Sequence, residues 1–434
     1  MHIPVVTVGQ SREDLVGGLE RLHGPVTVVR RCAELPELLA ACQSGLARAA
    51  VVAEGSEGLT ASLVDRLGAV GVAIVALTDN AEEAARLRTI GVASALSGVE
   101  SAELSERIAD AVAQLTGALR PANLSAAADT AAALATDPVV PALDEEGRGA
   151  GQLIVVWGPA GSPGRTTVAV NIAGEMAADG RSVLLVDADT YGASVAAVLG
   201  LLDESAGLAQ ACRLADQGLL DAEALRKVAA TVATTAGTFR VLTGITRADR
   251  WTELRAPALG LVLERARQIA DVVVVDTGFC LEADEELSFD TTAPRRNAAT
   301  LRPLELADTV YAVGAADPVG VPRLVRALAE LEGAVPHASP TVVMNKVRSS
   351  SVGRAPERQL RDAWERYGPA SSLKAFLPYD PVAADAALLA GSLLLEASPE
   401  STLRRAIREL VCAPDQRKSK SSVFSSTPRR TAKD

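Results

Sequence analysis

The sequence has few of the residues on which several classes of protein depend. Five of its 434 residues are cysteines, three are histidines, and 3% are aromatic. The cysteines are scattered and form no C-x-x-C pair, which argues against a disulfide framework or a structural zinc site and is typical of a reducing cytoplasm. The histidines form no constellation, so a metal hydrolase or a catalytic triad has no support.

Long hydrophobic runs and excess positive charge are also missing. No window holds about 18 uninterrupted apolar residues, and the opening MHIPVVTVGQ lacks the basic region and apolar stretch of a signal peptide. Because 43 Lys+Arg stand against 54 Asp+Glu, the net charge is −11, and the whole molecule should not attract nucleic acid or an anionic membrane. We expect a cytoplasmic protein without a specific nucleic-acid partner, whose contact with the inner face of the membrane is peripheral, indirect or weak.

The composition that remains, 48% hydrophobic and 22% charged, is that of a globular protein with two or three cores. Residues 1–118 alternate five short apolar runs with amphipathic segments, which predicts a doubly wound α/β domain. Residues 119–150 are rich in Ala, Asp and Pro and predict a linker. A second α/β series occupies residues 151–413. Residues 414–434 carry six basic residues against two aspartates among many Ser and Thr, which predicts a disordered basic tail.

The most informative segment is LIVVWGPAGSPGRTTVAVNIAGEMAADGRSVLLVDAD. It predicts a strand, a Gly/Pro-rich loop, a helix that ends near Gly180, and a second strand that ends at Asp187. Bare backbone N–H groups in such a loop and the N-terminus of the helix favour a bound phosphate. The match to the P-loop pattern G-x-x-x-x-G-K-[ST] is partial, because the lysine position holds an arginine. The residues predicted to bind the nucleotide here are Gly161, Ser162, Pro163, Gly164, Arg165, Thr166 and Thr167.

Two other interpretations of this segment stay open. Glycines at 158, 161 and 164, followed by an acid at the end of the next strand, would suit a Rossmann-type site in which Asp187 holds a ribose. The spacing is G-x-x-G-x-x-G, however, and not G-x-G-x-x-G. The simplest interpretation is a tight strand-to-helix turn without a ligand.

Carboxylates follow two of the predicted strands. Asp187 and Asp189 form a D-x-D at a strand end, where carboxylates orient water and Mg²⁺ beside a γ-phosphate. The run DVVVVDTG is typical of a buried strand and ends in Asp276, at the position of a Walker B carboxylate. We therefore predict that Mg²⁺ is bound by Thr166, Asp187 and Asp276.

Asn345 and Lys346 come at the end of another apolar strand, in the run TVVMNKV. A side-chain amide at this position can read the edge of an adenine. Taken singly, an Asp or Asn at a strand end is more often a cap or a turn former. The order and spacing of these features together favour a nucleotide site.

These segments together resemble the MinD/ParA family of P-loop ATPases over residues 151–413. The matches are GPAGSPGRTT for a deviant Walker A loop, VLLVDAD for the switch I aspartates, VVVVD for Walker B, and VVMNKV. The run FLPYDPVAADAALLAG resembles the family's proline-containing adenine loop, in which Pro378 would contact the nucleotide. With its N-terminal domain, the chain resembles the CpaE/TadZ branch, which is associated with pilus assembly.

The resemblance implies ATP and Mg²⁺ as cofactors, Asp189 as the catalytic carboxylate that orients water, and a homodimer that forms on ATP binding. It also implies that the protein positions or regulates a membrane-associated assembly, with pilus/secretion or division proteins as partners. A septum-site or chromosome-partitioning ATPase is an alternative, although the negative charge argues against binding DNA. The other alternative is a metabolic P-loop synthetase, which needs a substrate pocket beside the γ-phosphate.

The loop departs from the family's pattern of two lysines. Aligned through Gly164, the first lysine falls on Ala160, which has no charge, and the second falls on Arg165. A planar guanidinium is not equivalent to a compact ammonium in a tight loop. Arg295 and Arg296 are candidates to replace the missing charge. We expect ATP binding with slow hydrolysis.

The first domain resembles a response-regulator receiver, which has a flavodoxin-like fold. Phosphotransfer in a receiver needs an acidic pair after the first strand, an Asp after the third, a Ser or Thr after the fourth and a Lys after the fifth. Here Glu54 follows the third apolar run, Ser97 and Gly98 follow the fifth, and only Thr78 matches. We expect a flavodoxin-like domain used for docking or dimerisation, followed by a P-loop NTPase domain with a mostly parallel twisted sheet.

Overall fold

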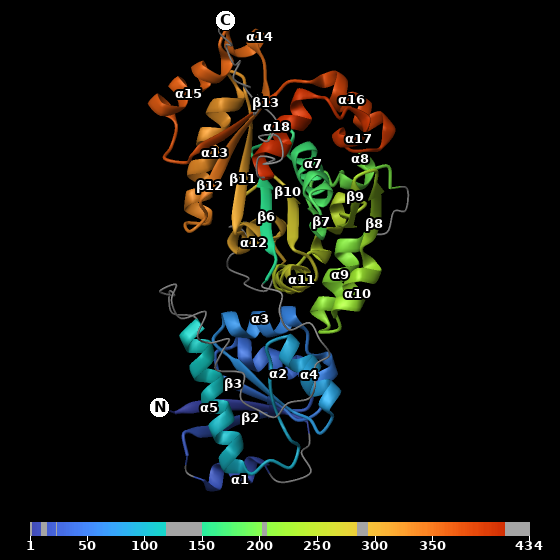
Figure 1. The fold of residues 1–434 in the computed structure, drawn as a ribbon. Coiled ribbons are helices and arrows are strands. Elements are labelled where there is room, and N and C mark those ends of the chain that lie inside the picture. Colours follow the sequence, from blue (N-terminus) through green and yellow to red (C-terminus); the bar gives the residue numbers. More distant parts are fainter. Residues whose placement is uncertain are drawn as a thin grey trace, which may run out of the picture.

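The computed structural model describes residues 2–9, 15–22, 24–118, 150–201, 206–283 and 294–412. Two α/β units lie one above the other in Figure 1, each around its own sheet. The predicted linker, except Ala150, and the predicted basic tail fall outside the described residues. Within the described residues, every helix is too short or too polar to cross a membrane.

The N-terminal unit is a five-stranded parallel sheet in the order β2-β1-β3-β4-β5. This is the flavodoxin-like order of a doubly wound fold, so the predicted α/β class is confirmed. The strands are β1 (Ile3–Val8), β2 (Val26–Cys32), β3 (Ala49–Val52), β4 (Ala73–Leu77) and β5 (Ala93–Ala95). The helices are α1 (Leu15–Arg21), α2 (Leu35–Gln43), α3 (Ala61–Ala69), α4 (Ala81–Thr89) and α5 (Ser101–Ala118), with a 3₁₀ turn at Ser56–Gly58.

Each face of this sheet has its own hydrophobic core. Helices α2, α3 and α4 cover one face through residues such as Leu38, Leu67 and Leu87. Helices α1 and α5 cover the other face, where Leu104 and Ile108 are fully buried. Strands β3 and β4 are buried along their whole length, because helices lie on both sides, as expected for a parallel sheet.

The second unit is built on an eight-stranded sheet in the order β13-β12-β11-β6-β10-β7-β9-β8, in which only β8 is antiparallel to its neighbour. Its strands are β6 (Gln152–Trp157), β7 (Val183–Ala188), β8 (Ala230–Thr234), β9 (Gly237–Leu242), β10 (Val272–Thr277), β11 (Thr309–Ala315), β12 (Pro340–Val347) and β13 (Leu373–Pro378). The predicted mostly parallel sheet is confirmed.

The helices of this unit lie on both faces of the sheet. They are α7 (Arg165–Ala178), α8 (Val195–Val198), α9 (Gly207–Asp216), α10 (Ala222–Val228), α11 (Ala256–Ile269), α12 (Ala298–Leu306), α13 (Gly320–Ala334), α14 (Ser349–Val352), α15 (Pro356–Tyr367), α16 (Pro381–Ala390), α17 (Leu394–Ala397) and α18 (Thr402–Val411), with a 3₁₀ turn at Ala248–Glu253. Helices α9, α11, α12, α13 and α15 contribute to one core, and α7, α16, α17 and α18 to the other.

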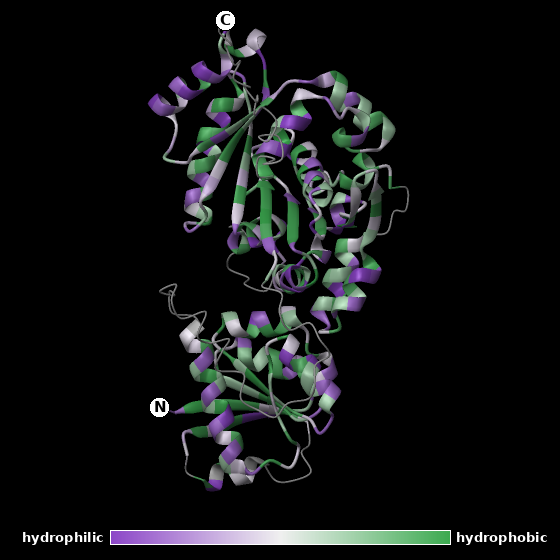
Figure 2. Cartoon of the chain, in the orientation of Figure 1, coloured by the Kyte–Doolittle hydropathy of each residue, from purple (hydrophilic) through white to green (hydrophobic). Residues whose placement is uncertain are grey.

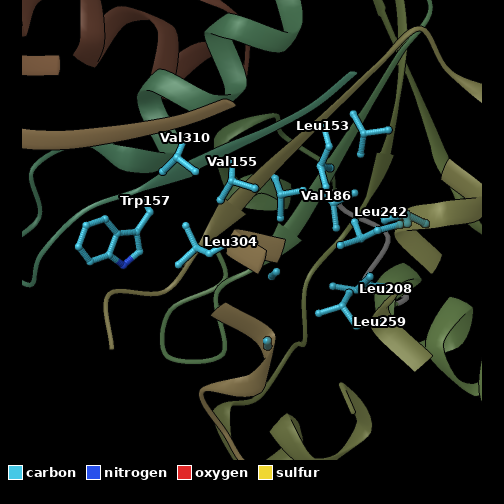
Figure 3. Packing of buried hydrophobic residues seen from close by; sticks show 14 of the residues in the cluster. Leu153, Val155, Trp157, Val186, Leu208, Leu242, Leu259, Leu304 and Val310 are labelled. Atoms are coloured by element: carbon cyan, nitrogen blue, oxygen red, sulfur yellow. The ribbon is translucent and has the colours of Figure 1, made fainter. Parts of the chain in front are cut away.

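The central strands are apolar on both faces because both faces are covered. Figure 2 shows β6 and β10 in green, with purple residues on the outer helices. Alternate residues of one strand enter different cores: Leu153 and Val155 pack with Trp157 and Leu304 in one core (Figure 3), while Ile154 enters the other. The continuous apolar runs in the sequence therefore mark buried parallel strands.

The register of the sheet brings polar side chains to one edge. Strand β10 lies between β6 and β7, and Asp276 pairs directly with Asp187 across β10 and β7. The carboxyl ends of parallel strands meet at this edge, where ligands bind in open α/β sheets. The loop from β6 to α7 begins at the same edge.

The two units contact each other through α3 and α4 of the first and α9 and α11 of the second (Figure 1). An Asp216 carboxylate oxygen accepts hydrogen bonds from the backbone N–H of Ser62, at 2.8 Å, and from its hydroxyl. The guanidinium of Arg86 donates to the carbonyl of Gln217 at 3.0 Å, and Leu261 packs against the N-terminal core. A carboxylate of the second unit thus caps helix α3 of the first.

Replacing Asp216 with alanine should loosen this contact. An N-terminal cap contributes about 0.5–2 kcal/mol, so we expect the N-terminal unit to unfold several degrees lower in calorimetry. Asp221→Ala is a matched control, because Asp221 caps α10 inside the second unit through the N–H of Ala224. Equal unfolding of the N-terminal unit in the two variants would contradict a capping contact between the units.

Candidate functional site

A cavity of about 660 Å³ lies at the carboxyl edge of the large sheet. Its walls come from the loop before α7, the segment after β7, the ends of β12 and β13, and helix α16. Every nucleotide-binding residue predicted from the sequence lines it: Gly161, Ser162, Pro163, Gly164, Arg165, Thr166, Thr167, Asn345, Lys346 and Pro378. Their roles toward a ligand stay predictions.

The loop between β6 and α7 has the backbone of an anion-binding turn. Gly161, Ser162 and Gly164 have φ values of 106°, 54° and 97°, in the left-handed region. A Cβ on Gly164 would lie 2.4 Å from the Asn345 amide nitrogen, so only glycine fits. Helix α7 begins at the next residue, and its free N–H groups and dipole add positive potential at the loop. This geometry favours a phosphate.

Arg165, at the lysine position, is held behind the loop. Its guanidinium donates to the carbonyls of Gly158, Pro159 and Thr277 at 3.0–3.1 Å. Its Nη2 lies 3.3 Å from Oδ2 of Asp189, and both side chains are largely buried. The arginine therefore joins the loop to the predicted catalytic carboxylate by a fixed, charged network.

Thr166 and Asp276 meet at the floor of the site. The Thr166 hydroxyl donates to Oδ2 of Asp276 at 2.6 Å, and the Ser194 hydroxyl lies 3.3 Å from that of Thr166. Burial, and then the neighbouring Asp187, hold the pKa of Asp276 well above its usual value. Its Oδ1 is buried without a hydrogen-bond partner among the described residues. An orphaned carboxylate oxygen beside a hydroxyl fits Mg²⁺, which prefers oxygen ligands and favours the charged form of the acid.

Asp187 differs from Asp276 in its hydrogen bonds. Both carboxylates are 1% exposed, and neither lines the cavity, whereas Thr166 does. The two carboxylate oxygens of Asp187 accept the backbone N–H groups of Asp189 and Val195. Burial raises its pKa to about 7, although these hydrogen bonds act in the opposite direction. Through these hydrogen bonds Asp187 fixes the turn after β7. Its predicted role as a metal ligand stays a prediction, and the geometry favours Thr166 and Asp276.

No group of three or more His, Cys, Asp or Glu side chains forms a metal site within the described ranges. Mg²⁺ is usually held by one or two carboxylates together with waters and substrate phosphates.

A cluster of aromatic, basic and amide side chains, which the sequence did not predict, packs against the segment after β7 and fixes it. The Tyr191 ring lies against Phe279, with ring centroids 4.9 Å apart, and the Arg296 guanidinium lies 3.9 Å from its centroid. The Tyr191 hydroxyl donates to Asn297, and Arg296 donates to the carbonyl of Thr190 at 2.7 Å. Arg296, predicted as a replacement charge, is thus bound within its own subunit, whereas Arg295 is exposed.

Asn345 and Lys346 contact the loop itself. The Asn345 amide donates to the carbonyl of Pro163, and the Lys346 ammonium donates to the carbonyl of Ser162, both at 2.8 Å. Asn345 was predicted to read an adenine edge, and its side chain also fixes the loop. Pro378 lies at the other end of the cavity, where Ala384 and Leu388 add an apolar wall suited to a flat base.

The predicted receiver residues lie at the ends of the small sheet. Glu54 follows β3 and is exposed, and Thr78 follows β4, where its hydroxyl oxygen accepts the N–H of Asn80. The Glu54 backbone and side chain fill the space beside Gly9, since a Cβ there would lie 2.6 Å from the Glu54 nitrogen.

The parallel sheet, the glycine loop before α7 and the Thr166–Asp276 pair define a P-loop nucleotide-binding protein. More narrowly, residues 154–389 match the family described as the CobQ/CobB/MinD/ParA nucleotide binding domain, and the chain belongs to this family of nucleotide-binding ATPases. A comparison with curated proteins found no match.

The chain is similar to several solved structures. A ParA family ATPase from Chlorobium tepidum has 17% identity and a TM-score of 0.50, with 60% of this chain and 99% of that chain covered. The cell division ATPase MinD from Pyrococcus furiosus has 22% identity and a TM-score of 0.47, with 60% and 97% covered. The septum site-determining protein MinD from Pyrococcus horikoshii, complexed with Mg-ADP, has 20% identity and a TM-score of 0.46, with 60% and 94% covered. At 17% identity, the likeness to the ParA family ATPase supports the fold alone.

Proposed function

We propose that this protein binds ATP with Mg²⁺, dimerises when it does so, and thereby positions or regulates a membrane-associated assembly. The assembly that we propose is a pilus or secretion apparatus. One observation carries the nucleotide part of the proposal. A single cavity is lined by a phosphate-binding loop, by Thr166, whose hydroxyl donates to the buried Asp276, and by an apolar wall at Pro378. The loop suits the triphosphate, Thr166 and Asp276 suit the metal ion, and the apolar wall suits the base.

The size and chemistry of the cavity support this ligand. A volume of about 660 Å³ lies in the range of small-molecule sites, roughly 300–1,000 Å³. Phosphates would accept from the backbone N–H groups of Gly161–Thr167 other than Pro163, which has none, and the base would lie near Leu388. Thr166 and Asp276 would hold Mg²⁺, which would neutralise charge on the phosphates.

The surface beside the cavity supports dimerisation. Helix α16 exposes Val382 and Leu389, which are 79% and 92% accessible, and Leu388, which also lines the cavity. Exposed apolar residues grouped at the mouth of a ligand site suit burial against another protein. A second copy of the chain would cover this surface when nucleotide completes it.

The N-terminal unit supports a role in docking. Its α3 and α4 lie against the second unit, whereas α1 and α5 lie on the opposite face of its sheet. We propose that this opposite face connects the ATPase domain to the assembly, without phosphorylation of Glu54. The pilus or secretion assignment itself depends on the resemblance of the whole chain to the CpaE/TadZ branch.

The nucleotide part is tested by light scattering after gel filtration. With ATP and Mg²⁺ the wild-type protein should have twice the monomer mass, and with ADP it should be a monomer. Thr166→Ala should remain a monomer with ATP, because the predicted metal hydroxyl is lost. Thr238→Ala, an exposed change on β9 outside the main cavity, is the matched control. A wild-type monomer under every nucleotide condition would contradict the proposed dimer.

The cellular part is tested with a fluorescent fusion. The fusion should gather at the envelope in cells with pilus or secretion genes, and should spread through the cell when these genes are deleted. Gathering at the division site, or on the nucleoid, would favour the septum-site or partitioning alternative. ATP hydrolysis by the purified protein that occurs only when a small carboxylic acid is added would favour the metabolic synthetase.

A further inference from the structure

The carbonyl groups of the phosphate loop are bound, almost one after another, by side chains from outside the loop. Arg165 binds two of them, and Arg323, Lys346 and Asn345 bind one each. The carbonyls and their donors are Gly158 and Pro159 with Arg165, Ala160 with Arg323, Ser162 with Lys346, and Pro163 with Asn345, all at 2.8–3.1 Å. We call these four side chains the carbonyl collar.

The collar has a direct consequence for phosphate binding. Because each peptide unit is planar and trans, its C=O and N–H groups point in opposite directions. Arg323 is the donor of this set that does not line the main cavity, and by holding the Ala160 carbonyl it keeps the N–H of the same peptide unit, that of Gly161, turned the other way. A loop rich in glycine would otherwise adopt many conformations, at an entropic cost when a ligand binds.

Arg323 is the member of the collar that no sequence motif reveals. It lies near the start of α13, where Asp317 accepts the N–H groups of Val319 and Gly320 and fixes the first turn. Its Nη1 donates to the Ala160 carbonyl at 3.1 Å, and a Cβ on Gly161 would lie 2.1 Å from the same atom. The guanidinium thus occupies the space that glycine leaves free.

The position of Arg323 separates it from the residues that would touch a nucleotide. It lines a small cavity of about 120 Å³ on the α13 side of the loop, together with Asp317 and Val319, and it does not line the main cavity. Its side chain is exposed. Any effect on the ligand must therefore pass through the loop.

We propose that Arg323 is a positioning residue for phosphate binding, which fixes the loop at Ala160 from outside the site. This rests on the proposed function, because the ligand is the phosphate chain of ATP or ADP. The guanidinium of Arg323 also places a positive charge beside Ala160, whose own side chain carries none.

The proposal is tested by calorimetric binding of ATP and ADP to the full-length protein. Loss of one charge-assisted hydrogen bond at the loop should weaken both affinities about 5- to 30-fold in Arg323→Ala, and Arg323→Lys should restore most of the loss. Arg323→Gln, which keeps the side-chain length without charge, should resemble the alanine variant. Arg326→Ala is the matched control, since Arg326 is exposed on the same helix and its side chain has no hydrogen-bond or ion-pair partner among the described residues. Thermal unfolding without nucleotide should be the same for all variants.

Each outcome separates the two proposals. If the wild-type protein binds neither ATP nor ADP, the proposed function fails. If the wild type binds both, and Arg323→Ala and Arg323→Gln bind as tightly, Arg323 has no positioning role and the proposed function stands. Weak binding by Arg323→Lys, equal to that of the alanine variant, would also overturn the positioning role, since a donor and charge would have been restored without effect.

Discussion

Replacing Arg165 with alanine is expected to weaken the binding of ATP and ADP by about 100-fold or more. The variant loses hydrogen bonds from a charged donor to the carbonyls of Gly158 and Pro159, and to that of Thr277. Hydrogen bonds to charged groups contribute about 1.5–3 kcal/mol each, and about 2.7 kcal/mol corresponds to 100-fold in affinity. The buried Asp189 carboxylate also loses its counterion, which adds negative charge beside the phosphates.

Calorimetry with both nucleotides measures this effect. Arg240→Ala is a suitable control, because Arg240 is exposed on β9, outside the cavity of the loop. Equal ATP affinity in the wild type and Arg165→Ala would remove the loop from the site. Tight binding of NAD in place of ATP would instead favour the Rossmann-type interpretation, in which Asp187 holds a ribose.

The parts of the site that lie at strand ends could be predicted from the sequence. The runs before Asp187, Asp276 and Asn345 form the predicted strands β7, β10 and β12. A parallel sheet brings the carboxyl ends of all its strands to one edge, so the pattern alone places these side chains together. Helix α7 begins at Arg165, where the loop pattern predicts a helix start, and Gly180 follows its end with φ of 89°.

The contacts between side chains distant in sequence could not be predicted. Arg323 reaches the loop from 163 residues away, and the periodicity of α13 shows only that the helix has a buried face. The ring of Tyr191 meets Arg296 because of how two loops pack. Asn345 at a strand end suits a base edge or a loop carbonyl equally well, and only the register of β12 beside β11 decides that it meets Pro163.

Hydrolysis is expected to be at or near the background rate in the wild-type protein, even when ATP is bound. Ala160 supplies no positive charge, and a cation supplied in trans to related phosphoryl-transfer sites contributes roughly 10³–10⁵ in rate. In addition, both carboxylate oxygens of Asp189, the residue predicted to orient water, already have partners within the protein. Oδ2 of Asp189 lies 3.3 Å from Arg165, and Oδ1 accepts the N–H groups of Tyr191 and Gly192.

Restoring the two lysines should raise the rate modestly. In Ala160→Lys with Arg165→Lys, the first change adds the missing charge, and the second replaces the guanidinium that holds Asp189 with a compact ammonium. Ala160→Lys alone is the matched control, because it adds charge and leaves the Arg165–Asp189 pair intact. Phosphate release measured under saturating ATP should increase more in the double variant than in this control. Wild-type turnover of about 1 s⁻¹ or faster, abolished by Asp189→Ala, would show that another group already replaces the lysines and that Arg165 does not restrain Asp189 when ATP is bound.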